Sequence, residues 1–169
     1  FRDDLNLNSL LIQRKQLSFW IRLMSPQAST VAQSVQFEPE FMAVLQHVTQ
    51  EFVPFNKVLG LKLCSANPTT AVASMEMQPT LVGHTVIQRI HGGVISAALD
   101  SMGGIAVMCA IAAKHMDEPP MKRAERFGKL GTIDLRVDYM RPGIGDRFTI
   151  RAEVLRLGSR VATTRMDFL

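Results

Sequence analysis

The sequence has 169 residues, enough for one domain with a hydrophobic core and too few for two domains of ordinary size. Apolar residues make up 47% of the chain and charged residues 20%, a balance that is typical of a folded protein and excludes a disordered one. The formal net charge of +4 would suit an anionic ligand, but no cluster of Lys and Arg interleaved with aromatic residues accompanies it. We therefore expect no nucleic-acid partner.

The first 36 residues differ in composition from the rest. Residues 10–23 are apolar but interrupted by Arg and Lys, so they are too charged for a signal peptide and too short to span a membrane. They are either an amphipathic surface helix or a translated upstream remnant, since Met24 has the features of a true start. We expect residues 1–36 to form an N-terminal extension, in part non-native or disordered, and residues 37–169 to form the folded domain.

The domain begins with a helical pattern that is followed by a hairpin pattern. From Pro39 onward apolar residues recur at i, i+3, i+4, i+7 and i+11, as on one face of a helix, until Pro54 ends the pattern. Residues 59–66 and 70–78 then predict two strands joined by an Asn-Pro turn.

Residues 91–114 predict one long helix of a different kind. The segment is apolar on nearly every face and rich in Gly, Ala and Ser, so such a helix must be covered all round, either by a protein core or by a membrane. Its length would suffice to cross a bilayer. However, Asp100 near its middle would cost roughly 3 kcal/mol on insertion, and strand patterns continue on both sides. These features favour a core helix, and we expect no membrane span.

The C-terminal part of the sequence predicts a sheet. A charged stretch, residues 117–129, is expected to be exposed. Residues 132–140, 147–157 and 161–169 then show the period-two alternation of strands with one polar and one apolar face. The alternation still runs at Leu169, so we expect the last strand to be cut short. One long buried helix plus a run of antiparallel strands predicts an α+β fold with the sheet wrapped over the helix.

Asp100 is the first candidate functional residue. An ionised carboxylate inside an apolar helix is costly unless it is paired or solvated. The positions one turn away carry no cation, because they are Ser96, Ala97, Gly103 and Gly104. In one interpretation Asp100 is structural and either accepts a hydrogen bond from a neighbouring backbone group or lines a wet crevice. In the other it is a catalytic base facing a cavity, where its small neighbours leave room for a ligand.

The second candidate is the His91-Gly92-Gly93 run at the start of the same helix. Free N–H groups at a helix N-terminus, with no side chain over them, suit a developing oxyanion, although such glycine pairs also serve tight packing. Gly92 and Asp100 are separated by about 12 Å of helix rise. One carbonyl cannot contact both, so a shared reaction would need two chains with antiparallel helices. The spacing therefore predicts a dimer if the protein is such an enzyme.

These residues, followed by the segment Thr132 to Gly143 (TIDLRVDYMRPG), resemble the PaaI-like, YigI-type family of hotdog-fold acyl-CoA thioesterases. The resemblance covers residues 37–169. It implies a long central helix wrapped by an antiparallel β-sheet, hydrolysis of acyl-CoA thioesters, a homodimer or homotetramer, and a cytoplasmic location.

The resemblance also implies roles for single residues. Asp100 would act as base or nucleophile, the Gly92 amide would polarise the thioester carbonyl, and Thr132 would help hold the water. His91 would orient the loop, with Gly93 beside it. Cations near the mouth would meet the CoA phosphates, unless they are ordinary surface charge, and the candidates are Arg123, Arg126, Lys129 and Arg141.

One position departs from the family pattern. Many relatives carry an Asn six or seven residues before the His of the HGG run, where this chain has Thr85 and His84. His84 or Gln88 would have to substitute for it in substrate binding.

Several other chemistries find no support in the sequence. The chain has no HExxH pattern, no Walker loop and no GxGxxG run, so we expect neither a metal nor a cofactor. Its two cysteines, Cys64 and Cys109, have no metal or redox spacing and fit a reduced, intracellular setting. The alternative function is a non-catalytic acyl-CoA-binding or sensor module on the same fold. A hydratase is a weaker alternative, because it would need a catalytic His paired with an acid.

Overall fold

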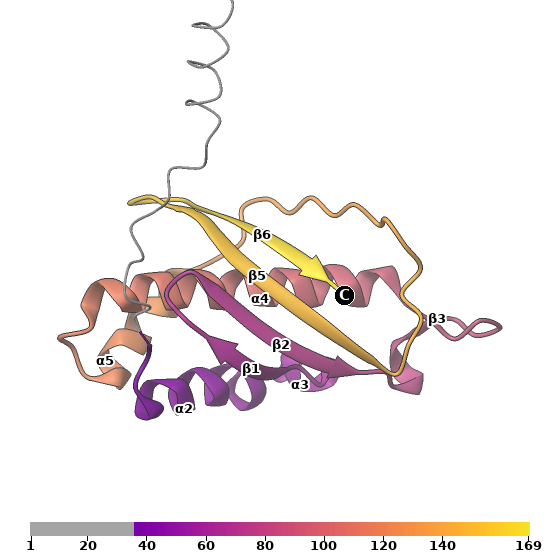
Figure 1. Cartoon of the computed structure of the whole chain (residues 1–169), viewed down its shortest axis with the longest axis horizontal. Helices are drawn as coiled ribbons and strands as arrows, with labels where there is room; N and C mark the ends of the chain where they lie inside the picture. Colours follow the sequence, from indigo (N-terminus) through magenta and orange to yellow (C-terminus); the bar gives the residue numbers. More distant parts are fainter. Residues whose placement is uncertain (1–35) are drawn as a thin grey trace, which may run out of the picture. The chain divides into compact units, whose positions relative to one another are not determined.

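The computed structural model of the chain describes residues 36–169, so the predictions for the N-terminal extension lie outside it. Figure 1 shows one long helix, α4 (Gly92–Ala112), lying against one face of an antiparallel sheet. The sheet has four strands in the order β1-β2-β5-β6, namely β1 (Lys62–Ala66), β2 (Thr70–Glu76), β5 (Arg147–Leu157) and β6 (Ala162–Phe168). The predicted α+β hotdog architecture is confirmed.

Three short helices precede the sheet. α2 (Pro39–His47) continues into a π-helical turn, η1 (Val48–Phe52), and α3 (Pro54–Leu59) follows with a proline at its first turn. Gly60 ends α3 in the left-handed conformation, at φ 69°, which a glycine adopts without steric cost. The prediction of a strand from residue 59 was therefore wrong at its start, because Leu59 belongs to α3.

Helix α4 supplies much of the core, but it is not covered all round. Ala98, Met102, Ala106 and Cys109 are fully buried in the core. A second row, one residue per turn from Gly92 through Ser96 and Asp100 to Gly104, is half-buried. Together with η3 (Ala113–His115), α4 is the one helix of residues 36–169 that is long and apolar enough to cross a membrane. The core helix of a soluble protein has the same properties.

The charged stretch after α4 was predicted to be exposed, and this is wrong for part of it. It folds into α5 (Pro120–Glu125) and the 3₁₀ turn η4 (Arg126–Lys129). Arg123 and Phe127 both point into the core. The charges concealed a short amphipathic helix, with α5 packed beside α2 near the end of α4 (Figure 1).

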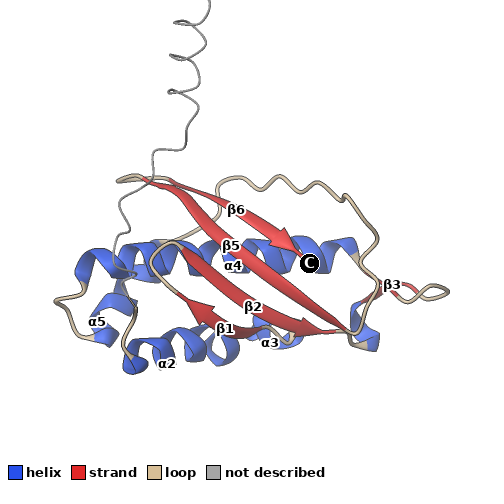
Figure 2. Cartoon of the chain, viewed as in Figure 1, coloured by secondary structure: helices blue, strands red, loops and turns tan. Residues whose placement is uncertain are grey.

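The predicted strand at residues 132–140 is also absent from the sheet. Residues 131–143, which we call the crossing segment, are extended but make no ladder with a strand, and Figure 2 draws them as a loop. Leu135 and Val137 are half-buried, whereas Ile133 and Tyr139 on the same side are exposed. In the middle of the segment the alternation therefore reflects contact of one side with the protein rather than pairing. A small two-stranded sheet, β3 (Val82–His84) and β4 (Arg89–Ile90), lies immediately before α4.

Candidate active site

The N-terminus of α4 is fixed by His91. Its backbone N–H donates to the Leu81 carbonyl at 2.8 Å, and its carbonyl accepts from the N–H groups of Val94 and Ile95 at 3.0 and 3.3 Å. Its ring caps the helix, because Nδ1 accepts the Gly93 N–H at 2.9 Å. His91 therefore holds the loop in place, and the Gly93 amide already has a partner.

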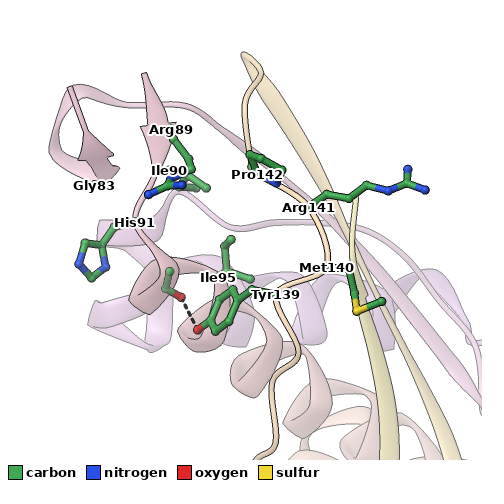
Figure 3. Close-up of a pocket in the computed structure, with 11 residues that line it drawn as sticks. Gly83, Arg89, Ile90, His91, Ile95, Tyr139, Met140, Arg141 and Pro142 are labelled. Atoms are coloured by element: carbon green, nitrogen blue, oxygen red, sulfur yellow. Dashed lines mark hydrogen bonds between the residues drawn. The ribbon is translucent and has the colours of Figure 1, made fainter. Parts of the chain in front are cut away.

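The two backbone polar groups of Gly92, its carbonyl and its N–H, differ in their hydrogen bonding. Its carbonyl oxygen lies 2.9 Å from the Ser96 hydroxyl oxygen. It also lies 3.0 Å from the Tyr139 hydroxyl oxygen, the contact that is dashed in Figure 3. Its N–H has no acceptor among the described residues. The peptide that carries this N–H is polarised through the His91 carbonyl, which accepts two bonds. Gly92 thus presents an open, oriented donor at the positive end of the α4 dipole.

Asp100 lies on the surface of α4 rather than inside the core. Asp100 is half-exposed, and the Thr132 hydroxyl donates a hydrogen bond to the Asp100 Oδ1 at 2.6 Å. No cation forms an ion pair with this carboxylate within residues 36–169. A carboxylate held by one hydroxyl and open to water can accept a proton from that water. Thr132 of the crossing segment is thus placed at Asp100.

A cavity of about 510 Å³ opens beside the start of α4. One wall comes from Gly83 and Ile90 of the β3–β4 sheet, and Tyr139 and residues 140–142 lie opposite (Figure 3). Gly92 also lines the cavity. Asp100 is not among its lining residues. On one chain, the Gly92 N–H therefore lies at this cavity and the Asp100 carboxylate lies outside it.

The two residues proposed to replace the missing Asn do not line the cavity beside Gly92. Both are exposed: His84 is the last residue of β3, and Gln88 lies in the turn before β4. The Gln88 side chain donates back to the Thr85 carbonyl at 2.6 Å, in a turn where Gln88 has a φ of 49°. Their part in substrate binding stays a prediction that the single chain does not explain.

The prediction for Arg123 needs correction. Its side chain is 1% exposed, forms an ion pair with Glu38 and lies 4.2 Å from the centre of the Phe41 ring. Its Nη1 also contacts the Met116 sulfur at 3.2 Å. A guanidinium enclosed in this way cannot reach a phosphate at the protein surface, so Arg123 is a structural residue.

The other two cations occupy different surroundings. Arg126 donates its Nε to Glu118 at 2.9 Å, and its hydrogen bonds and charge hold the pKa of the Glu118 carboxyl below its usual range. It lies next to α5, beyond the end of α4 that is distant from Gly92. Arg141, by contrast, is exposed and lines the cavity at Gly92.

Sequence reasoning missed three residues of this site. Tyr139 and Ser96 bond the Gly92 carbonyl, and Gly83 passes so close to His91 that a Cβ on it would lie 2.6 Å from the His91 Cα. Ser96 could have been found, because it lies one turn from both Gly92 and Asp100. Tyr139 gave only the signal of an aromatic residue on the apolar side of an alternating pattern.

Two further groups bear on the chemistry. No three His, Cys, Asp or Glu side chains in residues 36–169 lie close enough together to hold a metal ion. Burial raises the pKa of the Cys109 thiol to about 12, so this thiol stays protonated at neutral pH and cannot serve as a nucleophile.

Known proteins resemble this chain in sequence and fold. A sequence model described as the thioesterase superfamily matches residues 88–169. The medium/long-chain acyl-CoA thioesterase YigI of Salmonella typhimurium is 39% identical over 115 residues, which are 68% of this chain and 74% of that protein. A crystal structure from Shewanella oneidensis, described as related to the thioesterase superfamily, is 35% identical with a TM-score of 0.69 and covers 79% of this chain and 89% of that one. The Escherichia coli PaaI structure, 17% identical with a TM-score of 0.58 over 76% of this chain and 81% of PaaI, shares the fold.

One long helix packed on one face of an antiparallel sheet is the architecture of the hotdog fold. The chain belongs to the thioesterase superfamily, in its PaaI-like hotdog branch, and is a thioester hydrolase. The alternative of a non-catalytic binding module is therefore not favoured.

Proposed function

We propose that the protein hydrolyses acyl-CoA thioesters to the free acid and CoA at a site shared between two subunits. Asp100 of one subunit acts as base or nucleophile, and the Gly92 N–H of the other polarises the thioester carbonyl. The observation that carries the proposal is the position of these two groups on one helix, about 12 Å apart along its axis. The YigI relative, whose name specifies medium and long acyl chains, supports acyl-CoA as the substrate.

The free face of α4 supports the second subunit. Between the crossing segment and α3, α4 presents small and apolar side chains that no described residue buries completely, namely Gly93, Ala97, Gly104, Met108 and Ile111. An antiparallel α4 from a second copy that packed on this face would bring its Asp100 beside Gly92. Ser96, halfway between these two residues, would then lie next to the two-fold axis.

In the base form of the mechanism, Asp100 takes a proton from water, and the resulting hydroxide attacks the thioester carbonyl carbon. The oxyanion that forms accepts the Gly92 N–H, and its collapse breaks the carbon–sulfur bond. The CoA thiolate then takes the proton back from Asp100. Thr132, bonded to one oxygen of Asp100, leaves the other oxygen for the water. In the nucleophile form, that free oxygen attacks the carbonyl carbon, the carbon–sulfur bond breaks and the CoA thiolate leaves, so that a mixed anhydride forms. Water then hydrolyses the anhydride to the free acid and the Asp100 carboxylate, and the remaining proton goes to the CoA thiolate.

Substrate contacts complete the proposal. Arg141 at the cavity beside Gly92 would meet the CoA phosphates, and His91 and Gly93 hold the loop that presents the donor. The contacts from His84, Gln88 and Arg126 would have to be made in the assembled dimer or tetramer. A cytoplasmic location, where acyl-CoA is available, is part of the same proposal.

The acid is tested by Asp100→Asn, assayed by release of free thiol from a panel of short, long and aromatic acyl-CoAs. We expect kcat to fall by about 10²–10⁴-fold, the usual contribution of a general base, with an unchanged melting temperature. A loss below about threefold would contradict the assignment.

The shared site is tested by mixing two inactive variants, Asp100→Ala and Gly92→Pro. Proline removes the N–H donor, and it suits the first position of a helix after His91, whose ψ is 135°. A heterodimer of the two variants carries one site with both groups intact, so activity should return on mixing and re-association. Heterodimers that form but stay inactive would exclude a site made from both chains.

A further inference from the structure

Tyr139 makes contacts that the hydrolytic step does not require. Its hydroxyl lies 3.0 Å from the Gly92 carbonyl oxygen and 3.0 Å from the Ser96 hydroxyl, which itself bonds the same carbonyl at 2.9 Å. Two hydroxyl protons are available for these three contacts, so at least one of them donates to the Gly92 carbonyl. The ring lies against Gly92, because a Cβ added there would lie 3.3 Å from the ring.

These contacts hold the peptide unit between Gly92 and Gly93 at both ends. Tyr139 and Ser96 bond its carbonyl oxygen, and the His91 ring accepts its N–H. The preceding peptide unit is held by the two bonds to the His91 carbonyl, so fixing the Gly92–Gly93 unit as well fixes the backbone dihedrals of Gly92. The neighbouring N–H, which belongs to the His91–Gly92 peptide, then has a single direction in space, and it is the one proposed to meet the thioester oxygen.

Gly92 needs such external support because glycine has no side chain to restrict its backbone. A donor that stabilises an oxyanion is effective only if it is held in place before the charge develops. The crossing segment provides this support from one side and is itself attached to Asp100 through Thr132 at its other end.

We propose that Tyr139, together with Ser96, is a positioning residue that orients the Gly92 N–H for the reaction. The inference rests on the proposed function and adds a residue to it. Tyr139 acts through the Gly92 peptide and not on the substrate carbonyl itself, although its ring lines the cavity where the substrate would enter.

The test is Tyr139→Phe, which keeps the ring over Gly92 and removes only the hydroxyl. We expect kcat to fall by about tenfold, less than the 10²–10³-fold that follows loss of an oxyanion donor, with KM changed by less than a factor of two. Ser96→Ala should give a smaller fall in kcat. The double variant should lose less than the two single losses combined, because both hydroxyls act on one carbonyl.

A spectroscopic measurement separates positioning from a general structural role. The probe is an acyl-CoA ketone in which CH₂ replaces the thioester sulfur, with ¹³C at the carbonyl, so that it binds without hydrolysis. On wild-type protein the carbonyl stretch should move to lower wavenumber relative to the probe in buffer. Tyr139→Phe should lose at least half of this displacement while still binding the probe, and Gly92→Pro should lose nearly all of it. Ser65→Ala, an exposed serine on β1, is the control and should behave as wild type.

The outcomes are distinct. If Tyr139→Phe keeps both its kcat and the full carbonyl displacement, the positioning role is wrong, whatever Asp100→Asn shows. If Asp100→Asn retains activity, the proposed function fails, and the carbonyl displacement still reports separately on Tyr139. Should Tyr139→Phe fold poorly by circular dichroism, Ser96→Ala decides: an unchanged displacement in that variant overturns the proposal.

Discussion

The two ends of the α4 region carry similar residues in opposite surroundings. At the first end, Arg141 and Tyr139 stand around an open backbone donor and a cavity. Beyond the last turn, Arg123 is enclosed by Phe41 and paired with Glu38. The same two residue types, an arginine and an aromatic residue, thus line a cavity at one end of α4 and pack in the core at the other. The comparison teaches that packing by neighbouring elements, rather than residue type, decides whether a cation on this chain meets a ligand.

The largest expected effect is the loss of stability when the buried Arg123 is replaced. Arg123→Ala leaves Glu38 without its partner and empties space beside Phe41, so the free energy of unfolding should fall by about 3 kcal/mol. Arg126→Ala is the matched control from the same region. The Arg126 side chain is 38% exposed in its pair with Glu118, so the loss there should be clearly smaller. Urea unfolding measures both, and equal losses would contradict the distinction. The kcat per folded molecule should be unchanged in Arg123→Ala.

The functional end is tested by two substitutions at one position. Gly92→Pro removes the N–H and adds a Cβ, whereas Gly92→Ala adds the Cβ and keeps the N–H. We expect a loss of about 10²–10³-fold in kcat for proline. Alanine should cost clearly less, because its Cβ has only to displace the Tyr139 ring, 3.3 Å away, by a few tenths of an ångström. If alanine lowered kcat as much as proline, the loss would come from the added Cβ and not from removal of the N–H.

A pH prediction follows from Cys109, buried in the second half of α4. Burial raises the pKa of this thiol from 9.0 to about 12, so between these values the native thiol keeps its proton while the unfolded chain releases it. Unfolding is therefore favoured as pH rises above 9. From pH 8 to pH 10 the wild type should lose about 1.4 kcal/mol more stability than Cys109→Ala. Chemical denaturation at the two pH values checks this, and parallel losses in both proteins would contradict it.

The smallest expected effect concerns the exposed cation at the cavity. Arg141→Ser should raise KM for acyl-CoA a few-fold with little change in kcat, because a phosphate contact far from the carbonyl binds ground and transition states alike. The effect should shrink as salt rises. An acyl group on a short uncharged thiol is the control substrate. If the variant slowed both substrates equally, Arg141 would not contact the CoA phosphates.

The sequence predicted the elements whose residues form local, periodic patterns. The hydrophobic run from residue 91 gave α4, and the alternation at residues 147–157 gave β5 with its bounds unchanged. The same alternation at residues 132–140 was misleading. A period of two requires only that one side of an extended chain meets the protein, and it does not require a neighbouring strand.

The candidate site divides in the same way. Asp100 and Gly92 could be chosen from sequence because each breaks a local rule, a charge in an apolar helix and bare glycines at its start. Tyr139 could not, because its role depends on a contact across 47 positions of sequence. The prediction that Arg123 contacts a CoA phosphate was wrong because its charge suggested a position at the surface. Its burial follows from the packing of α5 near α2, which the sequence does not reveal.

The position of β6 has a consequence for the behaviour of the protein at high concentration. β6 is the last strand in the sheet order, and within residues 36–169 its outer backbone groups pair with no other strand. Such an edge can template the addition of another chain, and charged side chains on edge strands counter that tendency. β6 exposes Arg165 and Asp167 at alternate positions. We expect these two charges to counter such addition, and replacing both with valine should produce β-rich aggregates that bind thioflavin T.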